Sequence, residues 1–290
     1  PGSAGGGRRL EMIPLKVHAV RWTGRALDLV DQRRLPARVT DQRFAEHVIV
    51  LMNRQIARRG VIAQYRLGEW LGRYATTFDE LSNLLARDED DLFVDRCQLL
   101  GSRMTVGSRR IEEQLLSRVL TPYIFGDAEH FTARVARELS ERRQSFRLLP
   151  PGTIHLKENP GGLRETDLCL AIAQARLGVW DARGIETCDE LARRDPARSI
   201  LYQQLRTTYD FLVAVRSAYR VSVSATDEIE REHLAAPARI LGYEGRDAAA
   251  AALLFADLEH RLADSALLVD ELAGLAHLPP SPSPAATERL

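Results

Sequence analysis

The sequence predicts a mainly α-helical fold: a helical bundle with a small N-terminal module that contains a β-hairpin. Apolar residues recur at helical spacing through most of the chain after residue 36, as at Phe44, Val48 and Leu51. Thr-x-x-Glu, a sequence that caps helix N-termini, begins at Thr77 and again at Thr187. A length of 290 residues with 45% hydrophobic residues is enough for one large domain or two modest ones.

The N-terminal part carries the clearest strand pattern. Val17 and Ala19 alternate with polar residues, Thr23-Gly24 supplies a turn, and residues 26–30 return to an extended pattern. We expect four segments in the chain, which are a Gly-rich flexible leader (1–11), the module with the hairpin (12–75), the helical bundle (76–278) and a Pro/Ser-rich tail (279–290).

Helical periodicity dominates the remainder of the chain. Gly101, Gly178 and Gly242 follow apolar runs and are typical of helix C-termini. Thr77 to Glu80 and Thr187 to Glu190 each predict a capped helix start. The other expected helices cover residues 40–60, 90–100, 109–124, 127–146, 164–177, 197–222, 228–241 and 247–276.

Composition excludes several classes of function. With 40 basic and 40 acidic residues the formal net charge is zero, so we do not expect nucleic acid or an anionic membrane as a partner. No apolar run is long enough to span a bilayer, and the start has no secretory signal, so we expect a cytoplasmic protein. Three separated cysteines form neither a disulfide framework nor a CxxC site, and the histidines lack HExxH spacing, so no metal site is predicted.

One loop between helical stretches carries most of the functional signal. Its sequence is Lys157-Glu-Asn-Pro-Gly-Gly-Leu-Arg-Glu165. Pro160 fixes φ, whereas Gly161 and Gly162 can adopt positive φ and allow close approach to a ligand or to another part of the chain. The helix that begins at Leu163 would present free amide groups to a phosphate or carboxylate.

The charged residues of this loop leave two interpretations open. Lys157 and Arg164 flank the predicted anion site, and a group of arginines before the loop could extend it as a basic groove. Glu158 and Glu165 could instead neutralise the two cations as ion pairs and leave a rigid structural turn. The arginines in question are Arg137, Arg142, Arg143 and Arg147, which could equally form a solvated face.

Residues 157–165 resemble the Lys-Glu-Gly-Pro-Gly-Gly-Leu-Arg-Asp segment of the protein PII uridylyltransferase family. Phe211 to Tyr219 is similar to that family's Phe-Leu-x-x-Val-Arg helix, and Ala235 to Tyr243 is similar to its Ala-x-x-Leu-Gly-Tyr segment. The resemblance covers about residues 78–275. It implies the nucleotidyltransferase-associated helical domain of this family, with a role in binding a nucleotide, another anionic ligand or a protein substrate.

The resemblance also assigns the candidate ligand-binding residues. Lys157, Gly161, Gly162 and Arg164 would contact the anion, Glu158 would orient the cations, and Glu165 completes the set. The resemblance assigns no catalytic residue, and we do not expect the binding module itself to hold a cofactor. A catalytic domain on another chain, or a regulatory protein partner, is compatible with this role.

The catalytic motifs of the family are missing from this sequence. Its nucleotidyltransferase half carries an Asp-x-Asp pair that holds magnesium, but Asp28 and Asp31 have the wrong spacing. Asp88 and Asp90 have the spacing but precede a helix, and no histidine is followed by aspartate. One alternative is therefore a diverged nucleotidyltransferase that uses Asp28, Asp31 or Asp88 with magnesium and a nucleotide. Another is a purely structural protein-interaction module.

A second resemblance concerns the N-terminal module. Residues 19–36 are similar to the opening hairpin of methylthioribose-1-phosphate isomerases, which ends in Leu-Asp-Gln-x-x-Leu-Pro, and Arg59 to Ala63 continues the likeness. That family's catalytic residues belong to a later domain without a counterpart here. The resemblance therefore implies a small module with this hairpin and no isomerase activity.

Overall fold

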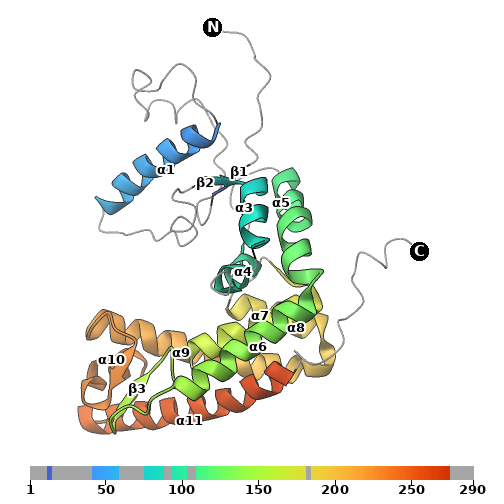
Figure 1. The fold of residues 1–290 in the computed structure, drawn as a ribbon. Coiled ribbons are helices and arrows are strands. Elements are labelled where there is room, and N and C mark those ends of the chain that lie inside the picture. The colour runs from blue at the N-terminus through green and yellow to red at the C-terminus, as the bar shows by residue number, and fades with distance from the viewer. Residues whose placement is uncertain are drawn as a thin grey trace. The chain divides into compact units, whose positions relative to one another are not determined.

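The structure is a computed structural model that describes residues 12–14, 41–58, 75–87, 93–102, 109–180 and 184–274. Helices dominate these residues, which confirms the predicted mainly α fold (Figure 1). The chain divides into two compact units, Pro1–Gly126 and Asp127–Leu290, whereas the sequence-based domains meet at residue 75. The predicted hairpin, the Pro/Ser tail and the candidate aspartates Asp28, Asp31 and Asp88 lie outside the described residues.

Two short strands and five helical segments make up the described part of the first unit. They are β1 (Met12–Pro14), α1 (Asp41–Ala57), β2 (Ala75–Thr77), α3 (Phe78–Leu85), α4 (Phe93–Leu100), α5 (Arg109–Leu115) and the π-helix η4 (Leu116–Phe125). β1 pairs antiparallel with β2, with Met12 opposite Thr77. The predicted helix over 109–124 is therefore α-helical only to Leu115. Pro122 lies in the wider turns that follow, where the missing amide of a proline removes one helical hydrogen bond.

The first capping box is confirmed. Thr77 Oγ1 accepts a hydrogen bond from the Glu80 amide at 3.2 Å, and Glu80 Oε2 accepts one from the Thr77 amide at 3.0 Å. The helix behind it, α3, buries its apolar face, including Phe78, Leu81 and Leu85. The cap thus fixes where the chain changes from β2 to α3.

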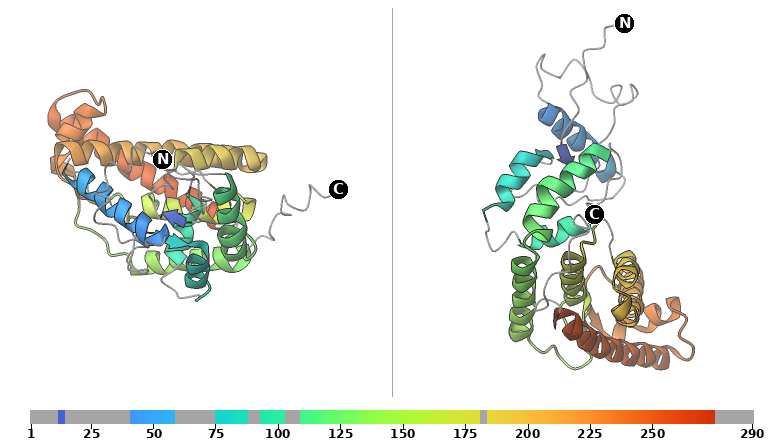
Figure 2. Two further views of the ribbon diagram at one scale, coloured as in Figure 1. Left: turned by 90° about the horizontal axis from the view of Figure 1, so that it is seen from above. Right: turned by 90° about the vertical axis from the view of Figure 1, so that its right-hand side faces the viewer.

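The second unit is a bundle built around α7. Its elements are α6 (Ala128–Ser145), β3 (Thr153–His155), α7 (Leu163–Leu177), α8 (Ile185–Arg194), η5 (Pro196–Arg198), α9 (Ser199–Ser222), β4 (Glu228–Glu230), η6 (Arg231–His233), α10 (Ala235–Ile240) and α11 (Asp247–Ala273). Figure 2 shows the long helices α6, α7, α9 and α11 in two further views. Helix α7 packs against α6, α8, α9 and α11 and is buried around nearly its whole circumference.

Two predicted features of this unit are wrong. The expected helix over 228–241 begins instead as β4, which pairs antiparallel with β3 so that Ile154 lies opposite Ile229. The capping box at Thr187 does not form, because α8 already starts at Ile185 and Thr187 is buried inside the helix. Gly178, by contrast, ends α7 in the left-handed conformation with φ of 65°, as predicted.

Within the described ranges, no helix combines the length and the apolar character that crossing a membrane requires.

Candidate functional site

The loop between β3 and α7 is anchored in the core of the second unit at both ends. Leu156 and Leu163 are 0% and 4% exposed and belong to the apolar cluster that also contains Ile154 of β3. The Leu163 amide donates to Leu156 O at 2.9 Å, and the Arg164 amide donates to Lys157 O at 3.1 Å. The nine-residue motif is therefore a closed turn whose ends are hydrogen-bonded to each other.

The amide groups at the start of α7 are engaged inside the protein. Besides the two bonds above, the Gly161 amide donates to Glu165 Oε2 at 2.9 Å and the Gly162 amide donates to Asn159 O at 2.8 Å. The expectation of free amide groups at this helix N-terminus is therefore wrong, because the loop itself supplies their acceptors. An anion at the loop would therefore meet side chains rather than these four amide groups.

The two glycines permit close backbone packing. Gly161 has φ of +73°, and a Cβ atom at this position would lie 2.1 Å from Leu262 O of α11. Gly162 has φ of −74°, so only one of the two glycines adopts the positive φ that the sequence suggested. A Cβ atom on Gly162 would lie 2.7 Å from Leu156 O. The sequence left open whether Gly161 allows close approach to a ligand or to another part of the chain. The structure shows close approach to another part of the chain, helix α11.

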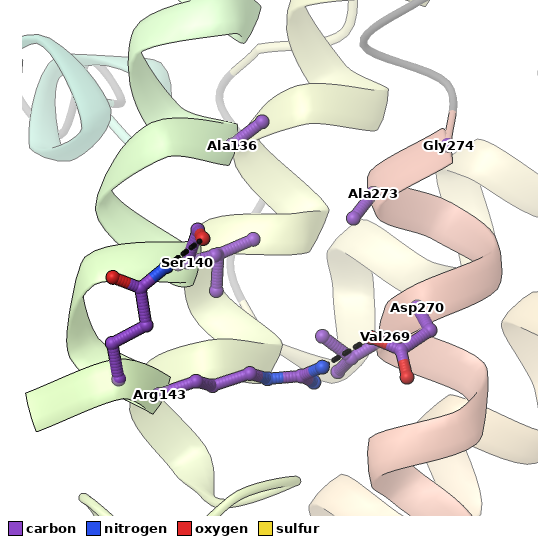
Figure 3. A pocket seen from close by; sticks show the side chains of 9 residues that line it. Ala136, Ser140, Arg143, Val269, Asp270, Ala273 and Gly274 are labelled. Carbon is purple, nitrogen blue, oxygen red and sulfur yellow. Dashed lines mark hydrogen bonds and ion pairs between the residues drawn. The ribbon is translucent and has the colours of Figure 1, made fainter. Parts of the chain in front are cut away.

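Glu165 is the buried acidic group of the motif, at 3% exposure. Arg143 of α6 binds it with two hydrogen bonds, from Nε to Oε1 at 2.9 Å and from Nη2 to Oε2 at 2.8 Å. Arg143 also pairs with Asp270 of α11 (Figure 3). This Glu165 clamp (Arg143, Glu165, Asp270) therefore joins α6, α7 and α11. The hydrogen bond to Glu165 raises the pKa of Arg143 above its ordinary value.

A cavity of about 600 Å³ adjoins the clamp between α6 and α11 (Figure 3). Its walls are mainly small or apolar, and Arg143 and Asp270 close one side. The lining residues are Ala136, Leu139, Ser140, Arg143, Gln144, Val269, Asp270, Ala273 and Gly274.

Glu158 is the half-buried acidic group of the motif, and three cations surround it. Arg164 Nη2 lies 3.1 Å from Glu158 Oε1, Arg142 Nη1 lies 3.3 Å from Oε2, and Lys157 Nζ lies 3.8 Å from Oε1. The Lys157 side chain is 39% exposed and that of Arg164 is 23% exposed. Arg142 is also paired with Glu138, at 2.7 Å. Lys157 and Arg164 thus share one carboxylate in this Glu158 cluster (Arg142, Lys157, Glu158, Arg164).

His155 and Asn159 shape the turn from within. His155 Nδ1 accepts hydrogen bonds from the Lys157 and Glu158 amides at 3.3 and 3.2 Å. Asn159 Oδ1 accepts one from the His155 amide at 2.8 Å. Both side chains therefore replace backbone acceptors, which explains why polar residues occupy these loop positions.

Asp167 is a charged group near the motif that sequence reasoning missed. Tyr209 of α9 donates a hydrogen bond to Asp167 Oδ1 at 3.1 Å. Solvent reaches the Asp167 side chain, but the protein packed around it reduces its hydration, which raises its pKa to about 6. Tyr209, Arg164 and Arg216 act in the opposite direction and lower this pKa. Tyr209 lies far from the motif in sequence, so nothing local could have indicated this pair.

The structure thus separates the predicted site residues into two groups. Lys157, Glu158 and Arg164 lie together at the surface of the loop. Gly161, Gly162 and Glu165 are buried beneath it and hold the loop against α6 and α11. The sequence suggested that Arg142 and Arg143 could form part of a basic groove. In the structure Arg142 binds Glu158 of the first group, and Arg143 binds Glu165 of the second.

The match to a known family concerns this same unit. Residues 129–274, about half of the chain, match the sequence profile of the family described as GlnD PII-uridylyltransferase. A bifunctional uridylyltransferase/uridylyl-removing enzyme of Pseudomonas fluorescens strain SBW25 is 25% identical over 155 residues, which are 52% of this chain and 16% of that enzyme.

A similarly named enzyme of Stutzerimonas stutzeri strain A1501 is 25% identical over 181 residues, 61% of this chain and 19% of the enzyme. That of Nitrobacter winogradskyi is 26% identical over 178 residues, 60% of this chain and 18% of the enzyme. The chain therefore spans less than a fifth of each of these relatives. No solved structure matches the chain significantly. Through its helical second unit, the chain belongs to the GlnD PII-uridylyltransferase family.

Proposed function

We propose that this chain is a non-catalytic binding or regulatory module that holds an anionic ligand, or an acidic group of a protein partner, at the Glu158 cluster. The observation that carries the proposal is that Lys157 and Arg164, both partly exposed, share the single carboxylate of Glu158. These two cations therefore exceed the Glu158 carboxylate by one charge, on a loop whose backbone is fixed from beneath, and Arg164 also interacts with the nearby Asp167 carboxylate.

The geometry favours a phosphate or carboxylate over an uncharged ligand. Hydrogen bonds from guanidinium or ammonium groups to anionic oxygens are about twice as strong as neutral ones. Because the ion pairs at Glu158 are partly open to solvent, an incoming anion can compete with Glu158 for the same cations. The cations are held in place for this exchange, since Arg164 lies in the first turn of the buried helix α7 and Arg142 pairs with Glu138.

The family suggests which classes of ligand and partner the cluster would bind. Its name describes proteins that uridylylate PII, and the relatives are named as enzymes that transfer and remove uridylyl groups. We infer that the ligand of the Glu158 cluster is a nucleotide or an acidic group of the protein substrate, and that catalytic residues are supplied outside the described bundle. No metal or cofactor is assigned to the cluster.

A thermal-shift titration tests this proposal. The full chain is titrated with UTP, ATP, CTP and inorganic phosphate, each with and without magnesium, alongside Lys157→Ala and Arg164→Ala. A ligand at 100 times its Kd stabilises the native state by about 2.7 kcal/mol, so a shift in the parent that both variants lose supports the site. The control is Arg206→Ala, because Arg206 is also a surface arginine paired with one carboxylate, Asp189, at 3.0 Å. An unchanged shift in Lys157→Ala and Arg164→Ala contradicts the proposal.

The second candidate is a structural interaction module in which the loop is only a rigid turn. The internal hydrogen bonds of the Gly161 and Gly162 amides favour it. Its signature is loss of stability in loop variants with no response of the parent to any of the anions. A shift that requires both nucleotide and magnesium would instead support the diverged nucleotidyltransferase.

A further inference from the structure

Two carboxylates and an imidazole meet at the turn that follows β4, among residues with no part in the proposed function. Glu230 ends β4, and Glu232 and His233 lie on η6. His233 Nδ1 lies 3.0 Å from Glu230 Oε2, and Nε2 lies 3.9 Å from Glu232 Oε1. In this Glu230–His233 cluster (Glu230, Glu232, His233), one ligand atom from each residue lies within 4.8 Å of the other two.

The backbone that carries these side chains is fixed on both sides. Ile229 and Leu234, which bracket the cluster, are both 0% exposed. Glu230 is paired with Thr153 in the β3–β4 ladder, and the Arg231 amide donates to Gly152 O at 2.9 Å. The three ligand groups therefore project from an ordered turn, and bringing them together at an ion requires side-chain rotation rather than backbone folding.

The two carboxylates of the cluster, though not His233, border a cavity of about 800 Å³. Glu230 and Glu232 line it together with a third carboxylate, Asp247 at the start of α11. The cation among the lining residues, Arg231, holds its guanidinium over the Phe255 ring, 5.9 Å from the ring centre. An ion bound by the cluster would thus have open coordination positions beside a space large enough for water or a small ligand.

We propose that Glu230, Glu232 and His233 bind a zinc ion through one imidazole nitrogen and two carboxylate oxygens. A nitrogen ligand with carboxylates suits zinc and similar transition metals, whereas magnesium prefers oxygen ligands and retains its water. Glu-x-Glu-His is not a recognised metal-binding spacing, and these residues come together only through the turn at η6.

The test is a titration of the full, untagged chain with ZnCl₂ by isothermal calorimetry after removal of metal. Cys97→Ser is the parent, because Cys97 is the one cysteine among the described residues that is not buried. We expect one zinc equivalent, with affinity lowered about tenfold or more in His233→Gln and in Glu230→Gln/Glu232→Gln. His260→Gln is the control, since His260 is an exposed histidine that pairs with a single carboxylate, Asp264, at 3.2 Å. It should bind zinc like the parent.

Two further readouts decide the outcome. Co²⁺ in place of zinc should give a visible absorption band that His233→Gln loses, and circular dichroism should show that the variants remain folded. Equal zinc affinity in the parent and His233→Gln overturns the proposal. So does displacement of zinc by an equal concentration of magnesium, because that result would indicate nonspecific attraction to the carboxylates.

Discussion

Gly161 carries the closest backbone packing in the motif. Its φ is +73°, and an added Cβ would lie 2.1 Å from Leu262 O and 2.7 Å from the Ala266 amide nitrogen. Gly161→Ala should therefore lower the free energy of unfolding by on the order of 3 kcal/mol, from left-handed strain and overpacking together. Urea denaturation measures this change. Gly178→Ala is the control, because Gly178 has φ of +65° with open space around it, and only the strain of about 1–2 kcal/mol should remain. Equal losses in both variants would show that α11 yields at this contact.

Arg143 keeps the buried Glu165 carboxylate paired. Arg143→Met should cost about 3–5 kcal/mol of unfolding free energy, because the charge of Glu165 would lose its main partner. Arg194→Met, which removes an exposed pair with Glu190, should cost less than about 1 kcal/mol in the same denaturation experiment. Addition of Glu165→Gln to Arg143→Met should recover part of the loss. If the two single variants were equally stable, the clamp would not stabilise the bundle.

Asp167 should make stability depend on pH. Its pKa is raised to about 6 in the folded chain, above the ordinary value of about 3.9. Its protonated form is thus favoured on folding, so its contribution is complete below pH of about 4 and is lost as the pH rises through 6. The difference in unfolding free energy between the parent and Asp167→Asn, measured from pH 4 to 8, should show this fall. The carboxyl carbon of Asp167 should titrate near pH 6 by NMR, and higher in Tyr209→Phe; titration near 4 would contradict the account.

At the scale of elements, the start of α3 is fixed by its capping box. Thr77→Ala removes the hydroxyl that accepts from the Glu80 amide and should cost about 1 kcal/mol of unfolding free energy. Thr207→Ala is the control, because its exposed hydroxyl bonds only to Gln203 O within α9 and should change stability by less than about 0.5 kcal/mol. Equal stability of the two variants in urea denaturation would mean that β2 alone fixes the helix start.

The elements that the sequence predicted correctly are those whose signal lies within one continuous segment of the chain. Helices such as α7 and α11 carry their apolar pattern within one continuous run, and Gly178 ends α7 where a glycine would be expected. The β3–β4 sheet was missed because each strand has three residues and pairs with a segment far along the chain. Thr187 carried a capping pattern, but packing of α8 placed it inside the helix, so tertiary burial overrode the local preference.

The candidate site shows the same division. The glycines and charges of residues 157–165 were found because the motif is continuous in sequence. The groups that pair around the motif come from other helices. Arg143 of α6 binds both Glu165 and Asp270 of α11, and Tyr209 of α9 binds Asp167. These pairings could be known only from the structure. The amide groups of the loop were assigned to a ligand because sequence alone cannot show that Glu165 and Asn159 already accept their hydrogen bonds.

For the whole molecule, the family match and the second compact unit coincide, since residues 129–274 lie within Asp127–Leu290. The chain spans less than a fifth of each of the relatives. With zero net charge, the chain has no overall field to attract an anion. Selectivity for an anionic ligand would therefore have to come from the local charges of the Glu158 cluster.

The most direct test of this account is the Kd for UTP, measured by calorimetry at fixed ionic strength in variants of opposite charge. Lys157→Ala removes a cation and Glu158→Gln removes the carboxylate that competes with the ligand. The account predicts weaker binding in the first variant and tighter binding in the second, each by about tenfold if the charge contributes about 1.4 kcal/mol. Equal weakening in both variants, or no binding of UTP to the parent, would contradict it.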